Sequence, residues 1–156
     1  MRHAVVLDAQ LSVLLAVGAT GRHLIRSHKR LSAYDERDFD ILVEVMSLQE
    51  SIVWCPNVLS ETSNLTRQIN EPARSAIANT LMKLVNTAAE SYVPSIEAVA
   101  RPEYQRLGLT DAALLTLAAG DAVLLTADLD LHVAAETAGM MSVNFNTLRD
   151  RRPDFR

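Results

Sequence analysis

The chain has 156 residues, of which 49% are hydrophobic and 22% charged, and this length and composition predict one globular domain over residues 1–156. No apolar run approaches the roughly 18 to 20 residues that a membrane-spanning helix needs, so a membrane protein is not expected. The net charge of −4 argues against broad, nonspecific adhesion to nucleic acid. It leaves room for a nucleic-acid enzyme, because carboxylates clustered around a bound metal ion lower the formal charge.

The N-terminus and the single cysteine bear on the cellular compartment. Asp8 and Gln10 interrupt the apolar character that a signal peptide needs, so we expect a cytoplasmic protein. Cys55 is the only cysteine, which excludes an internal disulfide and a multi-cysteine zinc site. We expect Cys55 to be a small core residue at the end of a strand.

The first half of the chain alternates short apolar runs with longer amphipathic ones. From the N-terminus, the pattern predicts a strand over 4–7, a helix over 11–18 closed by Gly18, a loop or frayed helix over 19–35, a helix over 35–49, a strand over 51–55, and helices over 56–69 and 71–90.

The second half continues the alternation. Its pattern predicts a short strand over 91–95, two brief helical turns within 95–108, a helix over 111–119 capped by Thr110, a strand over 122–126, a helix over 129–139, a strand over 140–145 and a polar tail over 146–156. Strands separated by helices favour parallel pairing. We therefore expect an α/β protein, a three-layer α/β/α sandwich around a central parallel sheet of about four to five strands.

Four acidic residues stand where such a fold binds ligands. Asp8 follows the strand over 4–7, and Asp128 follows the strand over 122–126. In an open parallel sheet, ligands bind beyond the carboxyl ends of the strands, where the strand order reverses. Asp111 opens a helix and Glu61 lies one turn into the helix that begins at Pro56, and both are expected to border the same rim.

Converging carboxylates favour a particular chemistry. They repel each other and raise their own pKa values unless a cation joins them. Mg²⁺ or Mn²⁺ is the expected cation, because the chain offers no Cys/His set for zinc. Such a cation binds phosphate oxygens and helps to generate a hydroxide nucleophile, so the acids favour metal-assisted hydrolysis of phosphodiester bonds.

Each acid also has a purely structural interpretation. Asp111 is a favourable first-turn residue, Glu61 a solvated helix residue and Asp128 the cap of the following helix. Asp8 is the hardest to explain in this way, because a buried acid at the end of a central strand is costly unless it is paired or metal-bound.

The order of these motifs is similar to that of a known family. An N-terminal apolar strand that ends in Asp8 is followed by "VLSETSNL", "LGLTDAALLTLA" and "AVLLTADLDLHVAAETAGM". This ordered set, which spans nearly the whole chain, resembles the PIN-domain (PilT N-terminus) nucleases, including the VapC-type toxin ribonucleases.

The resemblance implies a PIN-like fold and a Mg²⁺- or Mn²⁺-dependent endoribonuclease that acts as the toxin of a type II toxin–antitoxin pair. It implies that Asp8, Glu61, Asp111 and Asp128 form the catalytic pocket, in which Asp8, Asp111 and Asp128 bind the metal ion. It further implies a homodimer and a small antitoxin that inserts a segment into the active-site groove.

Two supporting residues and one departure complete the resemblance. Thr126 matches the family's hydroxyl two residues before the fourth acid, where it orients a carboxylate or phosphate, and Asp130 is a candidate extra acid at the rim. The family commonly follows its first Asp with a small hydroxyl residue and then Asn or Ser, whereas this chain has Ala9 and Gln10. The alternative is therefore a catalytically weak or inactive PIN-like module that binds RNA or regulates.

Basic residues in two segments are the candidates for contacts with the RNA backbone. One is the stretch 21–30, with Arg22, Arg26, Lys29 and Arg30, and the other is "RDRR" at 149–152. The opposing interpretation is a solvated loop and a charged terminus.

A third class of protein also gathers acids at strand ends, namely the phosphoryl-accepting α/β receiver domain. Such a domain requires a Lys after its last strand. The segment "MMSVNFNTLRD" contains none, which disfavours this hypothesis.

Overall fold

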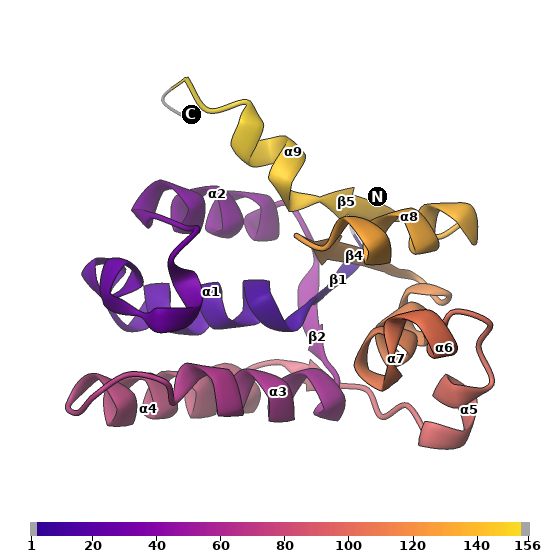
Figure 1. The fold of residues 1–156 in the computed structure, drawn as a ribbon, viewed down its shortest axis with the longest axis horizontal. Coiled ribbons are helices and arrows are strands. Elements are labelled where there is room, and N and C mark those ends of the chain that lie inside the picture. The colour runs from indigo at the N-terminus through magenta and orange to yellow at the C-terminus, as the bar shows by residue number, and fades with distance from the viewer. Residues whose placement is uncertain (1–2, 154–156) are drawn as a thin grey trace.

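The computed structural model describes residues 3–153 and contains a five-stranded parallel sheet flanked by helices (Figure 1). The strands lie in the order β3-β2-β1-β4-β5, with bounds Ala89–Glu90, Ser51–Trp54, Ala4–Leu7, Ala122–Thr126 and Ser142–Asn144. Every described strand pair is parallel. The expected three-layer α/β/α sandwich is therefore confirmed.

The α-helices of the structure are α1 (Ala9–Thr20), α2 (Glu36–Ser47), α3 (Pro56–Thr66), α4 (Ala73–Asn86), α5 (Ser95–Val99), α6 (Tyr104–Leu107), α7 (Leu109–Ala118), α8 (Leu129–Thr137) and α9 (Phe145–Asp150). Two short 3₁₀ helices, η1 (Arg22–Ser27) and η2 (Lys29–Leu31), connect α1 to α2. None of the described helices is long and apolar enough to cross a bilayer.

The pleat of β1 divides the core into two hydrophobic clusters. Val5 and Leu7 pack into a cluster with α1, and Val6 packs on the opposite face with the residues of α7 and α8. Side chains alternate between the two faces of a strand, so an unbroken apolar strand such as "AVVL" suits a sheet that is covered on both sides.

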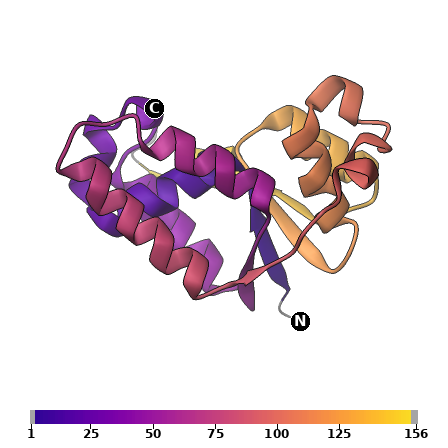
Figure 2. The same ribbon diagram turned by 90° about the horizontal axis from the view of Figure 1, so that it is seen from below.

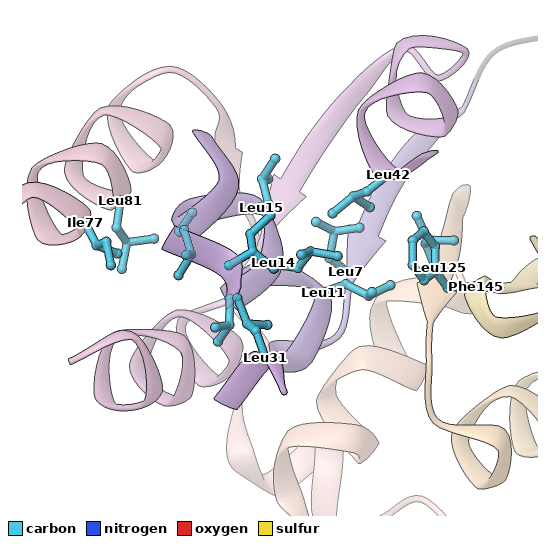
Figure 3. Packing of buried hydrophobic residues seen from close by; sticks show 14 of the residues in the cluster. Leu7, Leu11, Leu14, Leu15, Leu31, Leu42, Ile77, Leu81, Leu125 and Phe145 are labelled. Atoms are coloured by element: carbon cyan, nitrogen blue, oxygen red, sulfur yellow. The ribbon is translucent and has the colours of Figure 1, made fainter. Parts of the chain in front are cut away.

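Helix α1 lies at the centre of the larger cluster. Nine of its 12 residues are buried, because the sheet, α2, α3 and α4 surround it. Figure 1 shows α2 on one side of α1 and the pair α3 and α4 on the other, and Figure 2 shows that pair lying across α1 from below. In Figure 3, the leucines of α1 lie between Leu125 and Phe145 on one side and Ile77 and Leu81 of α4 on the other, all in one cluster.

Several predicted boundaries were wrong, and two errors involve glycines. Gly18 does not close α1, which continues to Thr20. Gly18 lies inside the helix, and its small size is needed there because a Cβ would overlap the ring of Phe39 on α2. Thr110 does not cap α7: that position belongs to Gly108, whose φ of 90° favours glycine, and Thr110 lies within the first turn.

The other errors concern irregular segments. The segment 19–35 contains the 3₁₀ helices, and the strand expected over 91–95 forms two residues earlier, at Ala89–Glu90. The expected polar tail over 146–156 contains most of α9, whose last residues are held by distant ion pairs described below, and residues 154–156 lie outside the described part.

Candidate active site

The candidate site lies at the point where the chain reverses its direction across the sheet. After β1 the chain builds β2 and β3 on one side, then crosses to β4 and β5 on the other. The carboxyl ends of the neighbouring strands β1 and β4 thus form the crevice where doubly wound sheets bind ligands. Asp8 directly follows β1, and Asp128 lies two residues beyond β4.

Asp8 is 6% exposed and its carboxylate accepts three hydrogen bonds. One oxygen accepts from the Leu11 amide at 2.8 Å, which makes Asp8 the N-cap of α1. The other accepts from the Thr126 hydroxyl at 2.5 Å and the Ala127 amide at 2.9 Å. Burial raises the pKa of Asp8 above its ordinary value, while the Thr126 hydrogen bond opposes that rise.

Thr126 joins the two strand-end acids. Its hydroxyl is fully buried, donates to Asp8 and accepts from the Asp128 amide at 3.0 Å. The Asp128 carboxylate in turn caps α8 by accepting from the amides of Asp130 at 2.9 Å and Leu131 at 3.3 Å. Thr126 therefore fixes the position of one carboxylate and the backbone of the other.

Asp111 is a second acid of the site whose pKa is raised. It lies in the first turn of α7, and its pKa is raised to about 7, first by burial and then by the negative charges of Asp128, Asp8 and Glu61. Glu61 extends from the middle of α3, exposed, and has no hydrogen bond or ion pair to another described residue. The other three acids thus lie near enough to Asp111 to repel its negative charge.

A pocket of 280 Å³ brings these acids together. Its lining contains Asp8, Glu61, Asp111 and Asp128, together with Ala9, Gln10, Tyr34, Leu65, Thr110 and Ala127. Asp130 is not part of this lining: it is exposed in the first turn of α8. We call this pocket the acidic pocket.

The acidic pocket suits a hard cation by its chemistry rather than by a ready-made ligand cage. Within residues 3–153, no three His, Cys, Asp or Glu side chains stand close enough together to form a metal-binding group. Mg²⁺, however, keeps several waters and commonly takes only one or two carboxylates from a protein. The carboxylate oxygens of the pocket are ligands of the kind that such an ion prefers, and burial followed by the charges of the neighbouring acids raises the pKa of Asp111 in its absence.

Tyr34 is a pocket residue that sequence reasoning missed. It comes from the irregular segment before α2, and its pKa is raised to about 12 by burial and by the charge of Asp8. The Arg149 guanidinium stacks on its ring, 4.6 Å from the centroid. No periodic pattern around Tyr34 pointed to the pocket.

A network from the C-terminal helix supports this side of the pocket. Arg149 donates to Asp38 at 3.0 Å, and Arg152 donates to Asp38 at 2.7 Å and Asp35 at 2.8 Å. Asn146, at the start of α9, donates to the carbonyl of Ala127 at 2.9 Å. The segment "RDRR" is a sequence-based candidate for contacts with RNA. Its residues Arg149 and Arg152 instead form ion pairs inside the protein, which argues against that role for these two arginines.

In the stretch 21–30, one of the candidate basic residues forms ion pairs with acids of the protein and the others are exposed to solvent. Arg22 forms ion pairs with Asp40 at 2.6 Å and Glu36 at 3.5 Å, so its charge is compensated. Arg26, Lys29 and Arg30 are exposed, and the Arg30 guanidinium donates to Gln68 at 2.8 Å.

Comparison of the chain with models of known protein families, with curated proteins and with solved structures found no match in any of the three.

Proposed function

We propose that this protein is a PIN-type endoribonuclease that hydrolyses RNA with the help of Mg²⁺ or Mn²⁺. The observation that carries the proposal is the convergence of Asp8, Glu61, Asp111 and Asp128 on one pocket. Two of them follow the strands β1 and β4, the other two lie on α3 and α7, and the first and last are 120 positions apart in the chain. Convergence from such distances is what the sequence resemblance predicts, and it is costly without a cation.

The chain's own groups have distinct tasks in this proposal. Asp8, Asp111 and Asp128 would hold the cation, one or two of them directly and the others through its water molecules, and when bound it would polarise the phosphate and lower the pKa of a water molecule. A carboxylate has about four lone-pair sites, and three donors already engage Asp8, so about one remains for a ligand. Those donors keep the carboxylate in a fixed orientation as the ion binds.

Glu61→Gln offers the cleanest test of activity. Glu61 contacts no other described residue through a hydrogen bond or ion pair, so the substitution should leave the free energy of unfolding unchanged within about 0.5 kcal/mol. We expect it to lower Mn²⁺-dependent cleavage of single-stranded RNA by at least about 100-fold. Glu44→Gln, at an exposed position of α2, is the matched control and should cleave like the wild type. Equal activity of the two variants would exclude the proposed site.

Metal binding can be measured without any turnover. Mn²⁺ should raise the melting temperature of the wild type, and more at about pH 8 than at about pH 5, because Asp111, with a pKa of about 7, must lose its proton to bind. Asp111→Asn should abolish most of this rise. A rise that is the same in the variant would place the ion elsewhere.

A non-cleaving RNA-binding or regulatory module is the second candidate. Two observations favour it: the Asp8 carboxylate is already engaged by three donors, and Gln10, where the family commonly has Asn or Ser, donates to the Arg30 carbonyl at 2.6 Å. Calorimetric titration with Mn²⁺ beside a nuclease assay separates the two. Binding without turnover supports the module.

The biological role follows from the same proposal. If the protein is a toxin of a type II pair, its expression should arrest growth, and Glu61→Gln should relieve the arrest. A small antitoxin would then be encoded beside it. The expected homodimer is tested by sedimentation of the purified chain.

A further inference from the structure

A second concavity lies beside the acidic pocket and carries the opposite charge. It has a volume of 700 Å³ and is bordered by the 3₁₀ segment, the end of α3 and the start of α4. Its lining contains three cations, Lys29, Arg67 and Arg74, and one acid, Glu71. We call it the basic cleft. Its lining has a net charge of +2, on a chain whose net charge is −4.

The charges of the basic cleft are available to a ligand. Lys29 and Arg67 are exposed, and neither forms an ion pair with a described residue. Arg74 uses its Nε–H for the Ile69 carbonyl at 3.0 Å, which holds the turn before α4. Glu71, in the turn before α4, is directed to the start of that helix, since its carboxylate accepts from the Ser75 hydroxyl at 2.9 Å and amide at 3.3 Å.

Direct contacts join the basic cleft to the acidic pocket. Gln10, which lines the acidic pocket, donates to the Arg30 carbonyl at 2.6 Å, and the Arg30 side chain donates to Gln68 of the basic cleft at 2.8 Å. Leu65, near the end of α3, lines the acidic pocket, and Arg67, the C-cap of that helix, lines the basic cleft. The two sites are therefore linked through the contacts of Gln10, Arg30 and Gln68.

A polyanionic substrate needs such a division of charge. Four carboxylates repel phosphate until a cation is bound, so affinity for a nucleic-acid strand must come from positive charge outside the acidic pocket. At 280 Å³, the acidic pocket admits part of one strand rather than a duplex. The neighbouring phosphates of that strand would then pass over the adjoining cleft.

We propose that the basic cleft, through Lys29 and Arg67, binds the sugar–phosphate backbone of a single-stranded RNA whose reacting phosphate lies in the acidic pocket. This inference rests on the proposed nuclease function and assigns the direction in which the substrate leaves the site. It differs from the sequence expectation for 21–30 in two ways: it does not use Arg22, which forms ion pairs with Asp40 and Glu36, and it adds Arg67 from another part of the chain.

The test is a salt titration of RNA binding in EDTA, where no cleavage occurs. Fluorescence anisotropy is measured for a labelled single-stranded oligoribonucleotide with the wild type, Lys29→Gln/Arg67→Gln, and the control Lys83→Gln/Arg106→Gln. Both variants lose two exposed positive charges, and Arg74 is retained because its side chain holds a turn. Lys83 lies about 14 Å along α4 from Arg74, and Arg106 lies on α6.

The cleft variant should bind about tenfold more weakly than the wild type. Its plot of log affinity against log salt concentration should be shallower by about 0.7 for each lost phosphate contact, hence by about 1.4. The control should keep the wild-type slope. Equal slopes for the two variants, or tighter binding of a polyglutamate peptide than of RNA, would overturn the inference.

Failure of this inference can be told apart from failure of the proposed function. If the wild type cleaves RNA in a metal-dependent way but the Lys29→Gln/Arg67→Gln variant binds RNA as tightly as the wild type, the role of the basic cleft is refuted and the nuclease function stands. Cleft-dependent binding without cleavage in Mn²⁺ or Mg²⁺ would support the cleft and refute the nuclease.

Discussion

Replacing Thr126 with valine removes the hydroxyl that joins Asp8 to Asp128 while keeping the shape of the side chain. The hydroxyl donates to a buried carboxylate at 2.5 Å, and it accepts from the Asp128 amide. A hydrogen bond to a charged group contributes about 1.5 to 3 kcal/mol. We therefore expect Thr126→Val to lower the free energy of unfolding by about 2 kcal/mol where Asp8 is ionised.

The pH dependence of this loss gives the mechanism a second readout. The Thr126 hydrogen bond lowers the pKa of Asp8, so its removal raises that pKa further in the folded protein. The folded variant then takes up a proton at higher pH than the wild type does. The difference in unfolding free energy should be largest above both folded-state pKa values and should shrink as the pH falls through them.

Thr62 provides a matched control for this experiment. It is fully buried like Thr126, but its hydroxyl has no hydrogen-bond partner among residues 3–153. Thr62→Val should therefore be neutral or stabilising. Urea unfolding of both variants between about pH 5 and about pH 9 measures the two effects. Equal losses in the two variants, or a Thr126→Val loss that does not change with pH, would refute the reasoning.

Three further predictions concern stability. Because the folded pKa of Asp111 is raised from 3.8 to about 7, the metal-free wild type should lose stability as the pH rises through that window. Asp111→Asn should flatten that part of the urea-derived curve, and an unchanged slope would contradict the raised pKa. Gly18→Ala should lower the free energy of unfolding by about 1 to 3 kcal/mol, since the new methyl group overlaps the ring of Phe39. Adding Phe39→Leu should restore part of this stability, as measured by thermal unfolding. Asp38→Asn should lower the free energy of unfolding by about 3 kcal/mol, because it removes the buried carboxylate that pairs with Arg149 and Arg152. A melting temperature equal to that of the wild type would show that these ion pairs are dispensable for stability.

The parts of the fold that the sequence predicted are those set by local chemistry. The strand over 4–7 and the strand over 122–126 have β-branched or leucine-rich runs that suit burial on both faces. Asp8 and Asp128 were identifiable because each follows a predicted strand, at the edge where a parallel sheet binds ligands. Once strands alternate with helices, the parallel sheet brings both acids to one edge.

The parts that were missed depend on contacts between distant segments. The segment that forms α9 looked like part of a polar tail, because Arg149 in the helix and Arg152 after it find their partners Asp35 and Asp38 more than 100 residues away. Arg149 of the same network also packs on the ring of Tyr34, which lines the acidic pocket. Neither feature therefore has a signal in the local sequence. Gly18 was misread for a related reason: its small size serves packing against Phe39 of another helix.

The four acids of the pocket differ in how much they say about function. Asp8 and Asp128 cap helices, so folding alone explains their positions. Asp111 lies in a first turn that favours negative charge, yet its pKa rises, which means that repulsion and burial outweigh the helix dipole. Glu61 forms no hydrogen bond or ion pair with another residue of the described range 3–153, and it lines the pocket with the other three acids. The Glu61→Gln variant is therefore the most direct way to test whether these acids form a functional pocket or serve only to stabilise helices.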